Sequence, residues 1–166
     1  MNADSDINVL AFADASYGIH SDGKSHSGLV ITLGEGPIFV KSSKQKIVTK
    51  STYEAELVSA SDAGSQIMWS RDFLLAQGYE VKEAILYQDN QATMKTLIDG
   101  RSSTERSRHI RVRYFWLHGE IQAKRLKVKY KDSKSMIADI LTKPLQGEMF
   151  IKLRAKLLNW YASTVT

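Results

Sequence analysis

Two acidic residues in this chain, Asp14 and Asp89, each stand at the end of a short apolar segment. Such segments predict strands, and in open α/β sheets binding sites form beyond the carboxyl ends of parallel strands. If the two strands are neighbours, their carboxylates converge, and either one of them takes up a proton or a cation lies between them. Carboxylate oxygens select hard cations, so Mg²⁺ or Mn²⁺ is the expected ion.

Two further acidic residues could complete such a site from helices. Glu56 lies near the start of a long helical pattern, and Asp139 lies inside the apolar stretch 137–141. Glu54 is two residues from Glu56, so the two point in different directions on a helix and only one can face the sheet. Each acid alone has a plainer interpretation as a turn, cap or solvent-facing residue. Together, four acids suit phosphodiester hydrolysis by two metal ions about 3.5–4 Å apart.

The remaining sequence predicts the elements that would hold these acids. Strands are expected over 7–14, 27–33, 38–42, 84–89 and 126–130, with a turn at 34–37 between the second and third. Helical spacing of apolar residues predicts helices over 51–77, 90–98, 106–123, 135–143 and 145–161. Three strands joined by turns and followed by alternating helices and strands predict an α/β fold, a mixed sheet with helices on its faces.

Composition limits the class of protein. The 166 residues fit one domain, which we expect to span 1–166 with a core at about 7–143 and a C-terminal helix at about 145–161. The sequence contains no cysteine, which excludes disulfides and thiolate metal sites. No apolar run is long enough to cross a membrane and the N-terminus does not resemble a secretory signal, so we expect no membrane partner.

Basic residues are concentrated between residues 101 and 131, within a net charge of +5. Those that flank or line the predicted helix 106–123 could follow the phosphates of a nucleic acid, although an ordinary solvated surface is the plainer interpretation. They are Arg101, Arg106, Arg108, Arg111, Arg113, Lys124 and Arg125. The aromatic run 114–116 fits the apolar pattern of the same helix, so we expect these three side chains in the core.

Six short segments, in order, resemble the ribonuclease H domain at the C-terminal end of the polyprotein of copia-type LTR retrotransposons. They are Asp14-Ala15-Ser16-Tyr17-Gly18, Lys24-Ser25-His26-Ser27-Gly28, Ser51-Thr52-Tyr53-Glu54-Ala55-Glu56, Asp89-Asn90-Gln91-Ala92, Arg108-His109-Ile110 and Ala138-Asp139-Ile140-Leu141-Thr142-Lys143-Pro144-Leu145. Each segment alone is a weak signal, but six in order are specific and cover nearly the whole chain.

The resemblance implies an RNase H fold, with a five-stranded mixed sheet made of an antiparallel meander plus parallel strands. It also implies hydrolysis of the RNA strand of RNA–DNA hybrids, leaving 3′-hydroxyl and 5′-phosphate ends. By motif match, Asp14 would bridge two Mg²⁺ ions, for which Mn²⁺ could substitute. Glu56 and Asp89 would hold one ion and Asp139 the other. Glu56 is preferred to Glu54 because the catalytic Glu of the family directly precedes an aliphatic residue on the buried face.

The same resemblance suggests partners and contact residues. The expected partners are an RNA–DNA hybrid and the reverse transcriptase region of the same polyprotein, and the expected location is the cytoplasm, in a virus-like particle. The candidate substrate-binding residues are Ser16, Asn90, Gln91, Arg108, His109 and Arg111. Asn90 is also a candidate helix N-cap. Hybrid binding through phosphates should weaken steeply as the salt concentration rises.

One feature departs from the cellular and retroviral enzymes, which carry a mobile His in the loop after the last strand. Here that loop is Lys131-Asp132-Ser133-Lys134 and contains no His. Lys131 or Lys134 could substitute electrostatically. His20 and His26, in the loop after the first strand, could approach substrate, and His109 is more readily a structural or substrate-contacting residue.

Three other functions remain open. An integrase- or resolvase-like DNA nuclease would share the fold, but the order of elements and the ending Lys143-Pro144-Leu145 favour ribonuclease H. A nucleic-acid-binding module without activity is disfavoured because all four acidic positions are filled. A structural metal-binding domain is disfavoured by the basic segment. The last helix carries no evident chemistry; we expect it to pack on the domain, with the reverse transcriptase region or a second copy as alternatives.

Overall fold

The computed structural model of the chain describes residues 7–100 and 108–160, with side chains from 7–100 and 115–160. Five strands form one sheet in the order β3-β2-β1-β4-β5. They are β1 (Ile7–Ser16), β2 (His26–Thr32), β3 (Pro37–Lys44), β4 (Val81–Gln88) and β5 (Lys127–Tyr130). The first three pair antiparallel, whereas β4 runs parallel to both β1 and β5. The predicted mixed sheet, a meander plus parallel strands, is therefore confirmed.

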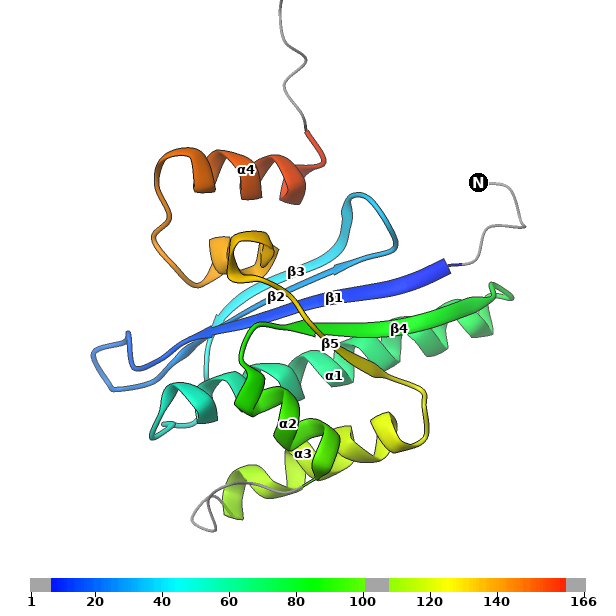
Figure 1. Cartoon of the computed structure of the whole chain (residues 1–166), viewed down its shortest axis with the longest axis horizontal. Helices are drawn as coiled ribbons and strands as arrows, with labels where there is room; N and C mark the ends of the chain where they lie inside the picture. Colours follow the sequence, from blue (N-terminus) through cyan, green and yellow to red (C-terminus); the bar gives the residue numbers. More distant parts are fainter. Residues whose placement is uncertain (1–6, 101–107, 161–166) are drawn as a thin grey trace, which may run out of the picture.

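Helices cover the two faces of the sheet unequally, as Figure 1 shows. One face carries α1 (Thr52–Ala76), α2 (Gln91–Asp99) and α3 (Arg108–Gln122). The other carries two short 3-10 helices, η1 (Ser133–Ser135) and η2 (Ile137–Leu141), and then α4 (Gly147–Leu158). Among the described helices, none is both long and apolar enough to cross a membrane.

The main core lies between the sheet and α1. Alternate residues of β1, Val9, Ala11 and Ala13, point toward α1 and are fully buried. Their small size lets the helix lie close to the strand, and the long apolar side chains of α1, such as Ile67, fill the remaining space. This packing fixes the N-terminal turns of α1 beside the end of β1.

The expectation that the aromatic run 114–116 lies in the core is wrong for Phe115 and Trp116, whose side chains are 46% and 43% exposed. Among the side chains of α3 that the structure describes, Leu117 is the fully buried one. It packs over Gly64 of α1, where a Cβ atom would lie 2.3 Å from a Leu117 methyl group. The close approach of α1 and α3 therefore depends on a glycine rather than on an aromatic cluster. The Tyr114 side chain lies outside the described residues.

The predicted helix 135–143 is also wrong in detail. It is replaced by η1 and η2, which are separated by Met136 in an extended conformation (φ −76°, ψ 95°) and fully buried. Contact with β2 brings η2 to this position. Gly28 of β2 meets η2 directly, because a Cβ there would lie 2.8 Å from Thr142 Cγ2 and 2.9 Å from the Ala138 carbonyl oxygen. Since Gly28 pairs with Asp14 in the β1–β2 ladder, η2 is brought down beside Asp14.

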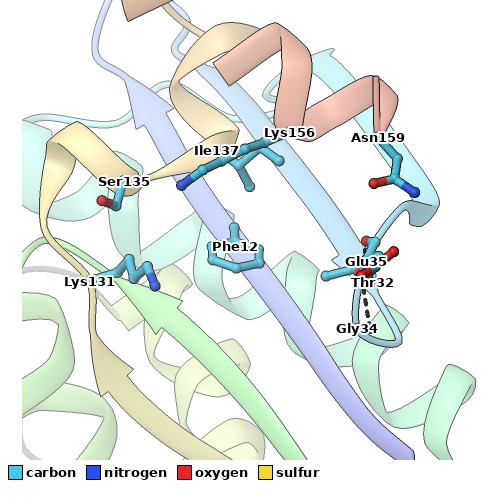
Figure 2. A pocket seen from close by; sticks show the side chains of 9 residues that line it. All are labelled: Phe12, Thr32, Gly34, Glu35, Lys131, Ser135, Ile137, Lys156 and Asn159. Atoms are coloured by element: carbon cyan, nitrogen blue, oxygen red, sulfur yellow. Dashed lines mark hydrogen bonds between the residues drawn. The ribbon is translucent and has the colours of Figure 1, made fainter. Parts of the chain in front are cut away.

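The predicted C-terminal helix forms as α4 and packs on η2. Within α4 only Leu153 is buried, while Ile151 and Leu158 are more than half exposed. Between α4 and the sheet lies a cavity of about 240 Å³, shown in Figure 2. Phe12 of β1, Lys131 and Lys156 are among the residues that line it.

Candidate active site

Three of the four predicted acids converge at one end of the sheet. Asp14 comes from β1, Glu56 from the start of α1, and Asp89 directly follows β4. Each offers a carboxylate oxygen, and these three oxygens all lie within 4.8 Å of one another. Because β1 and β4 are parallel neighbours, their carboxyl ends meet at the same edge, as the strand-end argument predicts.

Glu56 is held in this cluster by two donors. Its Oε1 accepts a hydrogen bond from the Ala15 backbone N–H (3.3 Å), and its Oε2 accepts one from the side-chain amide of Gln88 (3.2 Å). Gln88 is fully buried, and its own oxygen accepts the backbone N–H groups of Asp89 (2.8 Å) and Asn90 (3.3 Å). Gln88 therefore ties Glu56 to the turn that presents Asp89. Gln88 was not predicted as a site residue, although an amide that ends an apolar strand just before an acid was an available signal.

Glu54 is buried too, but it serves the start of α1 rather than the cluster. Its carboxylate accepts the Lys50 backbone N–H (2.8 Å), and its own backbone N–H donates to the Ser51 hydroxyl (3.2 Å). Ser51 is the N-cap of α1. The structure thus directs Glu56, and not Glu54, toward Asp14 and Asp89.

Asp139 joins the site through a lysine. The ammonium group of Lys143 lies 3.0 Å from Asp139 Oδ1 and 3.2 Å from Asp14 Oδ1. The Thr142 hydroxyl donates a hydrogen bond to the other oxygen of Asp14. Neither Thr142 nor Lys143 was singled out as a site residue from the sequence, although both lie in the last of the six motif segments.

Burial of so many acids shifts their proton affinities. Burial raises the pKa of Glu56 to about 9, and the negative charges of Asp14 and Asp89 add to the effect. Burial also raises the pKa of Asp14, against the opposing effect of the Lys143 charge. The pKa of Asp139 rises to about 6 through burial and the nearby Asp14. The cluster therefore holds more negative charge than its surroundings balance, which favours uptake of protons or of a cation.

These residues fit a divalent metal ion. Three carboxylates from three different elements converge, and they supply the oxygen ligands that Mg²⁺ and Mn²⁺ prefer. Among the described side chains, the partners of Glu56 and Asp89 are uncharged donors and no ammonium or guanidinium group pairs with either. Asp14 is the member of the cluster that also faces Asp139 through Lys143.

The loop that lacks a His reaches the acids through a serine. The Ser133 hydroxyl donates a hydrogen bond to Asp89 Oδ2 (2.8 Å). Lys131 lies instead over aromatic rings, with its ammonium 5.0 Å from the centre of Tyr87 and 5.9 Å from that of Phe12. Lys134 is exposed. Ser133 was not identified from the sequence, and its place in the loop for which the resemblance implies a His was the available signal.

The predicted substrate-binding residues are only partly described. Ser16 ends β1, and Gln91 is exposed in the first turn of α2. Asn90 is the N-cap of α2, and its side chain accepts the Thr93 N–H (3.0 Å), as the capping interpretation predicts. Three substrate-binding candidates and three further basic residues have side chains outside the described residues and stay predictions: Arg108, His109 and Arg111, with Arg101, Arg106 and Arg113.

His20 and His26 belong to a chain of polar contacts in which none of the four acids is a partner. Their rings are joined by a 3.0 Å nitrogen–nitrogen contact, and His26 contacts the Ser42 hydroxyl (2.8 Å). Ser42 in turn donates to the Leu141 carbonyl oxygen (2.8 Å). Burial and the neighbouring His20 lower the pKa of His26. The chain therefore ties the β1–β2 loop to the end of η2.

Comparison with known sequences finds polyproteins of mobile elements, while no family model matches the chain. The chain is 34% identical over 127 residues to the retrovirus-related Pol polyprotein from transposon TNT 1-94 of Nicotiana tabacum, covering 76% of the chain and 10% of that protein. It is 29% identical over 153 residues to the Pol polyprotein from transposon RE1 of Arabidopsis thaliana (91% and 10%), and 30% identical over 156 residues to the Ty1-DR5 Gag-Pol polyprotein of Saccharomyces cerevisiae (93% and 9%). The chain thus spans about a tenth of these relatives.

Solved structures that match the chain include RNase H domains. LC11-RNase H1, solved in complex with an RNA/DNA hybrid, matches with a TM-score of 0.59 at 14% identity, over 80% of this chain and 92% of that one. RNase H1 from Halobacterium salinarum matches with a TM-score of 0.52 at 18% identity (76% and 86%). The protease–reverse transcriptase of prototype foamy virus matches with a TM-score of 0.54 at 11% identity (86% and 21%).

Proposed function

Since the homologues of this chain are retrotransposon Pol polyproteins over most of its length, and since its fold is that of RNase H domains, we propose that it is a metal-dependent ribonuclease H. The proposed reaction is hydrolysis of the RNA strand of RNA–DNA hybrids during reverse transcription of a retrotransposon. The alternatives, a DNA nuclease of the same fold or an inactive binding module, become outcomes of the test below.

The observation that carries this proposal is the convergence of Asp14, Glu56 and Asp89. Their oxygens lie within 4.8 Å of one another at the carboxyl edge of the sheet, and two of the three residues are buried. A structural role would not require three acids from three elements to face each other, because their mutual repulsion destabilises the fold. The arrangement is therefore better explained by a cation that binds there in the working protein.

The four acids would hold two metal ions between them. Glu56 and Asp89 would hold one Mg²⁺ ion, Asp139 the other, and Asp14 would contact both. When bound, the two ions would activate water and stabilise the leaving oxygen, leaving 3′-hydroxyl and 5′-phosphate ends. Gln88 orients Glu56 through its 3.2 Å hydrogen bond, and Ser133 orients Asp89 through its 2.8 Å bond.

A hybrid duplex is the substrate that best suits the surroundings of the acids. Gln91, which is exposed, and Asn90 and Ser16, which are half-buried, lie on the segments that carry Asp89 and Asp14, where their amide and hydroxyl groups could contact 2′-hydroxyls or phosphates. LC11-RNase H1, which shares the fold, was solved with an RNA/DNA hybrid. The relatives are polyproteins, and a foamy virus chain joins this fold to a reverse transcriptase. We therefore propose the reverse transcriptase region as a partner.

The test is cleavage of labelled substrates by the 166-residue chain. An RNA–DNA hybrid, duplex DNA and the single strands are each incubated with Mg²⁺, Mn²⁺ or EDTA. We expect cleavage of the RNA strand of the hybrid alone, with either metal, and none in EDTA. Asp89→Asn should abolish it, because a neutral amide no longer balances the ion.

Glu80→Gln is the matched control, since Glu80 is an exposed acid just before the other end of β4. It should cleave at the wild-type rate. Cleavage of duplex DNA would favour the DNA nuclease instead. Activity that survives both EDTA and Asp89→Asn would rule out the proposed function. Hybrid binding without cleavage, when the reverse transcriptase region is supplied in trans, would identify an inactive module.

A further inference from the structure

The ammonium group of Lys143 contacts two of the four acids of the site, Asp14 and Asp139. We propose that it is an internal counterion that must leave Asp139 before a divalent ion can bind between these two acids. The lysine would then set the order of metal binding, with the Glu56 side filled first. This inference rests on the proposed function, since it concerns the same acids.

The geometry of Lys143 supports this role. Its Nζ atom lies 3.2 Å from Asp14 Oδ1 and 3.0 Å from Asp139 Oδ1, so one positive charge bridges the two carboxylates. A cation shared by Asp14 and Asp139 would compete with the ammonium group for these oxygens, since the other oxygen of Asp14 already accepts a hydrogen bond from the Thr142 hydroxyl. An ammonium group and a divalent ion cannot both occupy that space, so the two must compete.

The other half of the site has a different set of partners. Glu56 accepts from a backbone N–H and from the Gln88 amide, and Asp89 accepts from the Ser133 hydroxyl. All of these donors are uncharged, so an ion that binds between Glu56 and Asp89 displaces no charge among the described side chains. Lys143 contacts Asp14, which both halves share, and Asp139, which belongs to the second half alone, so its positive charge opposes a cation most strongly in the second half.

Lys143 is built to move aside without unfolding its segment. Its backbone N–H donates to the Asp139 carbonyl oxygen (2.9 Å), which fixes the main chain at the end of η2. Its side chain is 36% exposed, so the ammonium group can turn into solvent. The strong hydration of an ammonium group and its four-carbon stem make this exchange possible at modest cost.

The experiment measures Mn²⁺ binding to the metal-free 166-residue chain, with free Mn²⁺ followed by electron paramagnetic resonance and heats by calorimetry. The wild type should bind one ion tightly and a second more weakly. Lys143→Gln should strengthen the weak site on the order of tenfold, because the competing charge is gone, and leave the tight site within about twofold. Lys143→Met, which keeps an aliphatic stem, should give the same result, whereas Lys143→Arg should keep the second site weak.

Lys134→Gln is the matched control, because Lys134 is an exposed lysine in the loop near Asp89 and pairs with no described acid. If Lys134→Gln strengthens the second site as much as Lys143→Gln does, or if neither Lys143→Gln nor Lys143→Met changes it in a folded protein, the inference is wrong. The absence of any tight Mn²⁺ site, or a tight site that survives Asp89→Asn, would instead overturn the proposed function. Circular dichroism on each variant confirms that folded proteins are compared.

Discussion

Two regions on the same face of β1 place a lysine in very different surroundings. At the end of the strand, Lys143 lies between the carboxylates of Asp14 and Asp139. Two residues earlier, Phe12 lines the cavity under α4, and there the ammonium group of Lys131 lies over the rings of Tyr87 and Phe12 (Figure 2). The first lysine is partnered by charge and the second by the faces of two stacked aromatic rings.

The difference shows that local charge balance, and not the presence of a hollow, decides where a metal could bind. The charged side chains that line the cavity are two half-buried lysines and one exposed acid, Glu35, so it offers a cation a single carboxylate beside two ammonium groups. The acidic end has four carboxylates and, among the described side chains, a single ammonium group in contact with them. The contacts of the acidic end also bear on the expectation that Lys131 could substitute electrostatically for the absent loop His, because Lys143 rather than Lys131 contacts the acids.

The largest contrast between the two regions should appear in catalysis. Glu56→Gln removes a ligand from the acidic end, and the rate of hybrid cleavage should fall on the order of a thousandfold. Lys131→Gln removes the cation from the cavity, and the rate should change by less than about threefold. Both rates are measured at saturating Mg²⁺. Equal losses in the two variants would show that the cavity takes part in the reaction.

A second contrast depends on how η2 reaches the acids. Gly28→Ala introduces a methyl group 2.8 Å from Thr142 Cγ2, so η2 must shift away from Asp14. We expect a loss of about 1–3 kcal/mol in the free energy of unfolding and a fall in rate of about 10- to 100-fold. Denaturant titration and the cleavage assay measure the two effects.

Gly119→Ala is the control for this change, because a Cβ at Gly119 of α3 has no other atom within 4 Å. It should leave the rate unchanged and leave stability equal or slightly higher. A Gly28→Ala variant with wild-type activity would mean that Asp139 and Lys143 need not lie close to Asp14.

The cavity can be tested through stability alone. Phe12→Ala removes a ring stacked at 5.0 Å on Tyr87 and a partner of Lys131. Because Phe12 is only half-buried, we expect a loss of about 2 kcal/mol in the free energy of unfolding. Mn²⁺ affinity should stay within about twofold of the wild type. A folded Phe12→Ala protein that no longer binds Mn²⁺ would join the two regions into one site.

The smallest effect is a pH dependence of the metal-free protein. The pKa of Glu56 is raised from 4.5 to about 9 and that of Asp139 from 3.8 to about 6. As the pH rises, the unfolded chain releases these protons at lower pH than the folded protein does. The stability that the two groups contribute is therefore greatest below about pH 4 and is lost as the pH rises toward 9. Between about pH 6 and about pH 7 we expect a loss on the order of 1 kcal/mol.

Thermal unfolding in EDTA across this range measures the effect. Glu56→Gln should reduce the slope, and saturating Mg²⁺ should reverse the loss, since the ion replaces the protons. Asp22, whose pKa is lowered to about 2 by Lys44, is already ionised throughout this range and should not contribute. Metal-free stability that rises with pH over the same range would contradict the raised pKa of Glu56.

Much of the fold was accessible from local pattern. The five strands and α1, α2, α3 and α4 lie close to their predicted ranges, because period-two and period-3.6 spacing of apolar residues records which face of each element is buried. The errors occur where burial depends on a distant partner. Phe115 and Trp116 match a helical apolar pattern, yet Leu117 takes the buried position because Gly64 of α1 leaves room for it.

The sequence by itself determined the strand-end acids Asp14 and Asp89 and the choice of Glu56, since strand ends and motif spacing are local properties of the chain. Only the tertiary structure decided what surrounds them. Contacts such as that of Thr142 with Asp14, 128 residues apart, arise when Gly28 lets η2 settle on the sheet. The charge balance of the site depends on this packing. The pairing of Lys143 with Asp14 and Asp139 could therefore be identified only in the folded chain.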